Sequence, residues 1–161
     1  PRPMLVRGNW SLLDGEWAFG VGSDRSSIDG TIRVPFAPET PASGRHLSGY
    51  LDRCWYRREF DAPTKTAGDR VKLHFEAADF TTRVWVNGQL AGEHEGGYTR
   101  FSFDITELLT STGRQILEVS CDDCPHDLSK PRGKQDWQLS PHATAIRIHP
   151  ARLPSFGSLA L

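Results

Sequence analysis

The sequence has no apolar run of the roughly 18 residues that a membrane-spanning helix needs. It has no cluster of lysine and arginine that could follow a phosphate backbone, and its net charge is only −1. Heptads, internal repeats and low-complexity tracts are absent, as are a Gly-x-Ser-x-Gly nucleophile elbow and a Gly-rich phosphate loop. These absences predict no membrane and no nucleic acid as partners, and they give no hint of nucleophilic catalysis.

Cysteine is also scarce, and the three residues present form an odd number. An odd count argues against a disulfide framework and favours a reducing compartment, the cytoplasm, although a removed signal peptide would leave no trace. Cys121-Asp-Asp-Cys124-Pro-His126 resembles half of a zinc site, but structural zinc takes four ligands, and only Cys54 and scattered histidines remain to complete it. We therefore expect incidental thiols, no metal and no cofactor.

What the chain does contain is alternation. In residues 71–77 apolar side chains occupy the odd positions, which is typical of a strand with one buried face. Val84 and Val86 belong to a second alternating run, and Asn87-Gly88 then provides two residues that tolerate positive φ, as a tight hairpin requires. A third run follows at residues 101–105. This pattern predicts an antiparallel meander in the middle of the chain.

Shorter runs of the same kind flank the meander. Further strands are expected at residues 13–19, 32–34, 54–60 and 117–121, with a polar loop at 23–30 and one helical turn near 106–109. Fifteen glycines and 11 prolines supply the turns that many short strands need, and 161 residues are enough for one domain with a substantial core. The sequence predicts an all-β, antiparallel β-sandwich of the jelly-roll, galactose-binding-domain-like type, in preference to a closed barrel.

Several motifs then occur in a fixed order. They are Leu13–Trp17, Cys54–Arg58, Val84–Gly88, Gly96–Thr106 and Pro131–Trp137. This ordered set, over about residues 9–142, resembles the N-terminal sugar-binding domain of glycoside hydrolase family 2, the β-galactosidases, β-glucuronidases and β-mannosidases.

The resemblance implies a jelly-roll domain that precedes an immunoglobulin-like domain and a catalytic TIM barrel. A TIM barrel alone takes roughly 250 residues, so this chain is expected to hold no catalytic residue and to be inactive alone. The implied function is a non-catalytic sugar-binding domain that supports hydrolysis of β-galactoside or β-glucuronide bonds. Its implied partners are a terminal β-linked sugar, the catalytic barrel and, in the full enzyme, a homo-oligomer. A free-standing carbohydrate-binding module and a purely structural or oligomerisation module are the alternatives.

The end of the chain departs from the family pattern. Residues 1–142 are expected to form the domain, whereas residues 143–161 lack the aromatic-rich closing strand and carry scattered prolines. Our hypothesis is that the chain is a fragment whose last residues come from a shifted reading frame or a premature end. Pro1 in place of methionine suggests that something upstream is missing as well.

The resemblance also implies where sugar would bind. In some members of the family the loop that corresponds to residues 93–97 gives an acidic contact to the sugar. We interpret Glu95 as such a contact, because a carboxylate is a strong acceptor for sugar hydroxyls, and Glu93 as part of a solvated hairpin edge. Trp55, Trp85 and Tyr98 could stack on a sugar ring, but packing is favoured for aromatics at strand spacing.

The run at residues 131–137 combines hydrogen-bonding side chains with an aromatic ring, the mixture that a sugar pocket needs. An interdomain loop that pairs its charges with the barrel is the alternative interpretation. The predicted sugar-binding residues are Glu95, Tyr98, Arg132, Lys134, Gln135, Asp136 and Trp137.

Overall fold

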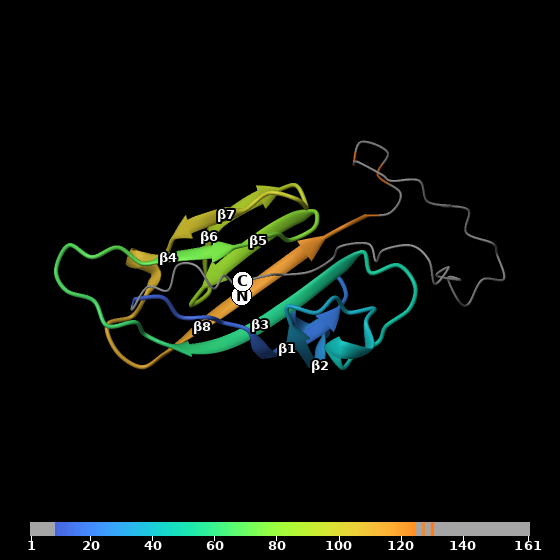
Figure 1. Ribbon diagram of the computed structural model, residues 1–161, viewed down its shortest axis with the longest axis horizontal. Coiled ribbons are helices and arrows are strands. Elements are labelled where there is room, and N and C mark those ends of the chain that lie inside the picture. The colour runs from blue at the N-terminus through green and yellow to red at the C-terminus, as the bar shows by residue number, and fades with distance from the viewer. Residues whose placement is uncertain (1–8, 125–126, 128–129, 131–161) are drawn as a thin grey trace, which may run out of the picture.

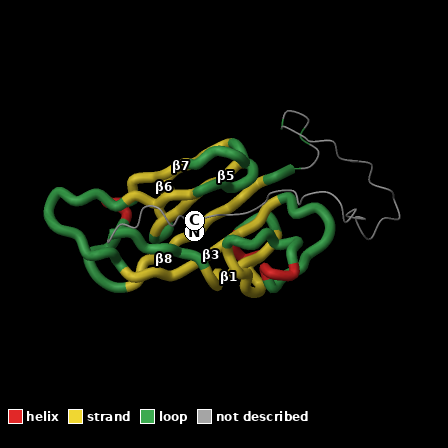
Figure 2. Tube along the Cα trace, in the orientation of Figure 1, coloured by secondary structure: helices red, strands yellow, loops and turns green. Residues whose placement is uncertain are grey.

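The computed structural model describes residues 9–124, 127 and 130. Within these residues the chain forms strands joined by loops, with three short 3-10 turns (Figure 2). The strands are β1 (Gly15–Val21), β2 (Ile28–Val34), β3 (Arg53–Asp61), β4 (Lys72–Phe75), β5 (Thr81–Val86), β6 (Gln89–Glu95), β7 (Phe101–Asp104) and β8 (Arg114–Asp122), and the 3-10 turns are η1 (Arg25–Ser27), η2 (Pro41–Ser43) and η3 (Thr106–Leu108). No helix in this part of the chain is long or apolar enough to cross a membrane.

Six of the strands form one antiparallel sheet in the order β2-β1-β3-β8-β5-β6, and β4 pairs with β7 in a second sheet (Figure 1). The predicted all-β antiparallel sandwich is therefore confirmed. The predicted meander is wrong, because the consecutive strands β4 and β5 lie in different sheets. Alternation identifies a strand and its buried face, but it does not identify the strand's partner.

The core lies between the two sheets. Trp17 and Phe19 of β1 and Val84 of β5 point into it from the large sheet, and all three are at most 1% exposed. Phe75 of the small sheet is fully buried and stacks on Phe101 with ring centroids 4.7 Å apart. Large aromatic side chains thus fill the space that a two-stranded sheet could not cover with smaller residues.

The tight turn predicted at Asn87-Gly88 connects β5 to β6. Its residues have φ of 51° and 81°, the left-handed conformation that this dipeptide tolerates. The limits of other strands differ from expectation. β2 begins at Ile28, within the predicted polar loop, because Ile28 and Gly30 pair with β1. The strand expected over residues 71–77 is shorter, since β4 ends at Phe75.

Candidate functional site

Four strand ends meet at one end of the sandwich, where the loop after β6 carries the predicted residues Glu95 and Tyr98. The strand register places Arg53 and Thr81 opposite Asp122, and Thr81 also opposite Glu95. The starts of β3 and β5 and the ends of β6 and β8 therefore share one edge of the molecule. We call this edge the rim and define it as Glu39, Asp79–Phe80, Glu95–Arg100, Asp122–Cys124 and Lys130.

Backbone hydrogen bonds join three segments of the rim at the Asp79–Phe80 corner. The Gly96 N–H donates to the Phe80 carbonyl at 2.9 Å, and the Phe80 N–H donates to the Asp122 carbonyl at 3.3 Å. Asp79 Oδ1 lies so close to Gly97 that a Cβ there would be 2.5 Å from it. The corner between β4 and β5 thus holds the β6–β7 loop on one side and the end of β8 on the other.

Carboxylates crowd the rim and perturb one another. Burial and, to a smaller extent, repulsion from Asp123 raise the pKa of Asp79 to about 6, against the opposing effect of the Lys130 ammonium. Burial, with a contribution from Asp123, also raises the pKa of Glu39. Within the described residues no group of three or more His, Cys, Asp or Glu side chains is placed to hold a metal ion.

Glu95 and Tyr98, two of the predicted sugar-binding residues, flank this corner. Both are exposed, Tyr98 at 78%, and neither has an ion pair or a side-chain hydrogen bond among the residues that the structure describes. Glu93 differs, since its carboxylate pairs with Arg83 on β5. The interpretation of Glu93 as a solvated hairpin edge agrees with that ion pair. Glu95 is free to accept from a ligand.

His94 supports the same loop from below. Its ring stacks on Phe101 with centroids 4.1 Å apart and lies 3.3 Å from the Thr99 hydroxyl. The side chain between Glu93 and Glu95 therefore packs on the core, which leaves its two neighbours pointing to the other face, as strand alternation requires.

The two tryptophans considered as sugar platforms pack against each other on the outer face of the large sheet. Trp55 is 7% exposed and stacks on Trp85 with centroids 5.4 Å apart. The Arg25 guanidinium covers the Trp85 ring at 4.8 Å and pairs with Glu118 at 3.3 Å. Packing, the favoured interpretation, therefore accounts for both tryptophans, whereas the exposed Tyr98 is not packed in this way.

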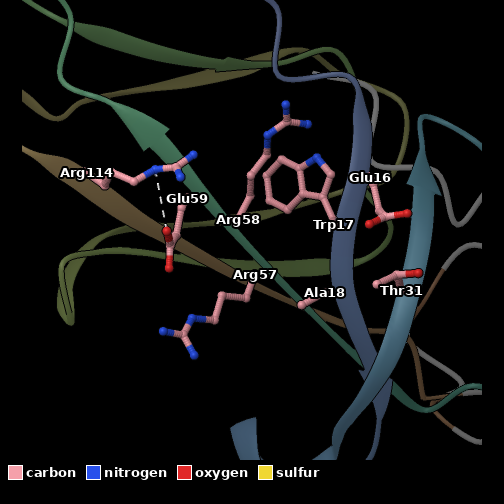
Figure 3. Close-up of a pocket in the computed structure, with 8 residues that line it drawn as sticks. All are labelled: Glu16, Trp17, Ala18, Thr31, Arg57, Arg58, Glu59 and Arg114. Carbon is pink, nitrogen blue, oxygen red and sulfur yellow. Dashed lines mark ion pairs between the residues drawn. The ribbon is translucent and has the colours of Figure 1, made fainter.

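The outer face also has an open depression of about 540 Å³ at the other end of β1 and β3. Figure 3 shows its side chains spread around the opening without converging on one point. Arg114 pairs with Glu59 at 3.5 Å, and the Arg58 guanidinium donates to the Leu13 carbonyl at 2.7 Å. Neither Glu95 nor Tyr98 lines it. The rim is therefore the better candidate site.

The remaining predicted residues, Arg132, Lys134, Gln135, Asp136 and Trp137, lie outside the described residues. The structure instead adds Asp79 and Lys130, which sequence analysis missed. A turn at Asp79 could have been expected, because an alternating run ends just before it and aspartate is common in turns. Nothing in the sequence connects it with Lys130, which is 51 positions away.

Comparisons with known proteins agree on one family. The family described as "Glycosyl hydrolases family 2, sugar binding domain" matches residues 27–122. The β-galactosidase of Thermoanaerobacter pseudethanolicus is 39% identical over 118 residues, which cover 72% of this chain and 16% of that protein. A putative β-glucuronidase of Formosa agariphila is 34% identical over 130 residues, which cover 80% of this chain and 14% of that protein.

The solved structures agree with these relatives. The β-glucuronidase of Bifidobacterium dentium, complexed with coumarin-3-O-glucuronide, matches with a TM-score of 0.59 and 32% identity over 68% of this chain and 19% of that one. The chain thus spans less than a fifth of the length of each of these three proteins.

Proposed function

This chain belongs to the sugar-binding domains of glycosyl hydrolase family 2, and from that membership we propose that it is the non-catalytic sugar-binding domain of a glycosidase acting on terminal β-linked sugars. The observation that carries the proposal is the family match over residues 27–122, which extends from η1 to the end of β8. The β-galactosidases and β-glucuronidases among its relatives support a β-galactoside or β-glucuronide as the bond that the whole enzyme hydrolyses.

Catalysis would then belong to another domain. A retaining glycosidase holds its acid and its nucleophile about 5 Å apart on a rigid frame, and a TIM barrel that provides this frame takes roughly 250 residues, more than the 161 of this chain. The proposed partner is such a barrel. We place the domain at residues 1–142 and treat residues 143–161 as a separate tail.

Within the domain, we propose that the rim contributes to the sugar site. Glu95 offers a charged acceptor to sugar hydroxyls, and the exposed ring of Tyr98 offers a stacking surface next to it. Two arginines, Arg53 and Arg83, already neutralise the Asp122 carboxylate, so this side chain is committed to the fold. The run of residues 132–137 follows β8 in the sequence and would complete the site with its hydrogen-bonding side chains and Trp137.

The test is a titration of the 161-residue chain with methyl β-D-galactoside, methyl β-D-glucuronide and methyl β-D-mannoside. The chemical shifts of the ¹⁵N-labelled chain, measured by NMR at each step, report the binding. We expect weak binding, with Kd in the millimolar range, and shifts concentrated on Glu95, Tyr98 and residues 132–137. Glu95→Gln should weaken this binding about tenfold, which corresponds to one charge-assisted hydrogen bond. Glu93→Gln is the matched control, because Glu93 pairs with Arg83.

The possible results separate the candidate functions. Micromolar binding by the chain alone would favour a free-standing carbohydrate-binding module. The absence of detectable binding to all three glycosides would favour a structural or oligomerisation module. Hydrolysis of a chromogenic β-glycoside by the purified chain would contradict the proposal that this domain is non-catalytic and that a separate barrel holds the catalytic residues.

A further inference from the structure

Lys130 lies at the point where the chain that leaves β8 meets the Asp79–Phe80 corner. Its side chain is only 11% exposed although it carries a charge. The ammonium donates to the Asp122 carbonyl at 3.1 Å, lies 3.7 Å from Asp123 Oδ1 and sits 4.9 Å above the Phe80 ring. A lysine ammonium is seldom buried unless such partners compensate it. These contacts therefore hold the lysine side chain in one arrangement, away from bulk solvent.

The corner in turn determines where the β6–β7 loop lies. Gly96 is bonded to Phe80, and the Asp79 carboxylate packs directly against Gly97. A side chain at position 97 would meet Asp79 Cγ at 2.7 Å as well as Oδ1, so only glycine allows this approach. Glu95 precedes this contact and Tyr98 follows it. Any movement of Asp79 must therefore move the backbone between the two exposed side chains.

We propose that Lys130 is a positioning residue for the rim, which fastens the chain after β8 to the Asp79–Phe80 corner and so sets the loop that carries Glu95 and Tyr98. This role deepens the proposed sugar-binding function and rests on it, because Glu95 and Tyr98 are the described side chains that the sugar would contact. Lys130 itself touches no sugar in this scheme.

The charges around Asp79 make the arrangement measurable. Lys130 favours the ionised form of the Asp79 carboxyl, whereas Asp123 favours the protonated form. Loss of Lys130 should therefore raise the titration midpoint of Asp79, and loss of Asp123 should lower it. The other ionisable side chains of the rim are Glu39, Glu95, Tyr98, Arg100, Asp122 and Cys124. Three groups beside the rim also bear on it: His94 contacts Thr99, Cys121 lies near Asp79, and Arg53 with Arg83 holds Asp122.

The test follows the amide resonances of Gly97 and Tyr98 and the carboxyl carbon of Asp79 by NMR in the whole chain between pH 4 and pH 8. In the wild type we expect all three to titrate with one midpoint near 6. Lys130→Met should raise that midpoint by about half a unit or more, and Asp123→Asn should lower it by a similar amount. Lys130→Arg should restore the wild-type midpoint, because it keeps the charge. Lys72→Met, on the exposed face of β4, is the matched control and should change nothing.

Asp123→Asn keeps the test decisive if Lys130→Met does not fold, since the Asp123 side chain is half-exposed. A Gly97 amide that does not titrate with Asp79 would overturn the proposal, as would a midpoint that neither substitution moves. A second measurement separates this outcome from a failure of the sugar-binding function. Lys130→Met should weaken binding of the best methyl glycoside severalfold and Lys130→Arg should restore it. Binding that Lys130→Met leaves unchanged would refute the positioning role even if sugar binds at the rim.

Discussion

Gln115 is the substitution site at which the structure makes its sharpest prediction about stability. It is a fully buried polar residue on β8, at the end of the sandwich away from the rim. Its Oε1 accepts from Asn87 Nδ2 at 2.8 Å and from the Thr110 N–H at 2.9 Å. Its Nε2 donates to Thr110 Oγ1 at 2.7 Å and to the Gly113 carbonyl at 3.0 Å. All four hydrogen-bonding positions of the amide are therefore filled.

Gln115→Leu keeps the approximate size of the side chain and removes every one of these bonds. Asn87 keeps a partner, because its Nδ2 also donates to the Leu108 carbonyl at 2.8 Å. The Gly113 carbonyl also keeps one, because the Ala62 N–H donates to it at 3.4 Å. The Thr110 N–H does not, and an unsatisfied buried group costs about 1–3 kcal/mol, of which water replaces a part because Thr110 is exposed. With a gain of about 1 kcal/mol from burial of the leucine, we expect a net loss of about 1 kcal/mol in the free energy of unfolding.

Urea denaturation followed by tryptophan fluorescence measures this loss, with Gln89→Leu at the exposed start of β6 as the control. The control should stay within about 0.5 kcal/mol of the wild type. Gln115→Glu should be destabilised increasingly as the pH rises above about 4.3, because burial raises the pKa of a carboxyl and thus penalises its ionised form. A Gln115→Leu variant as stable as the wild type would show that the amide network contributes nothing to the fold.

Three further predictions test the rim, the fit between the sheets and the thiols. Asp79 has a pKa raised to about 6 from 3.8, so its ionisation destabilises the fold as the pH rises through that window. Because solvent still reaches part of this side chain, Asp79→Asn should gain only about 1 kcal/mol relative to the wild type between pH 4 and pH 7 in urea denaturation. Gly92→Ala places a Cβ 2.3 Å from the ring of Phe103 on β7, which packs against the core, and this overpacking should cost about 1–3 kcal/mol in the same assay. Only the exposed Cys124 should react with Ellman's reagent in the native chain, because burial raises the pKa of Cys121 to about 12 and that of Cys54 further; a second fast thiol would contradict the structure.

The parts of the fold that could be predicted are those that neighbouring residues determine. The strand over residues 117–121 and the hairpin between β5 and β6 follow from alternation and from Asn87-Gly88, since each depends on side-chain direction or on φ over a few positions. Strand partners could not be predicted in this way. Lys72–Phe75 pairs with Phe101–Asp104 across the β5–β6 hairpin, and nothing in either segment favours this partner over the adjacent strand.

The same distinction, between features set by neighbouring residues and features set by distant ones, applies to the candidate site. The family resemblance led to Glu95 and Tyr98 beside a glycine turn, and both are exposed in the structure, although packing was the expectation for the Tyr98 ring. Gly97, the second glycine of that turn, is required by the close approach of the Asp79 carboxylate, which lies 18 positions earlier in the sequence and could not be inferred from the turn itself. Trp85 is a second example. Alternation with Val84 and Val86 places it on the outer face, as the structure shows, but does not predict that Arg25 covers its ring.

The physical reason for this division is that a sandwich closes its ends with loops that come from distant parts of the chain. At the rim the end of β8 and the start of β5 are neighbours, although Thr81 and Asp122 are 41 positions apart in the sequence. A charge buried there, such as Lys130, must therefore be compensated by groups from other segments, here the Asp122 carbonyl and the Phe80 ring. Such compensation is a property of pairs and not of single residues. It follows that the function of the rim is best tested by substitutions with opposite expected effects on one shared group, which is the relation of Lys130 and Asp123 to Asp79.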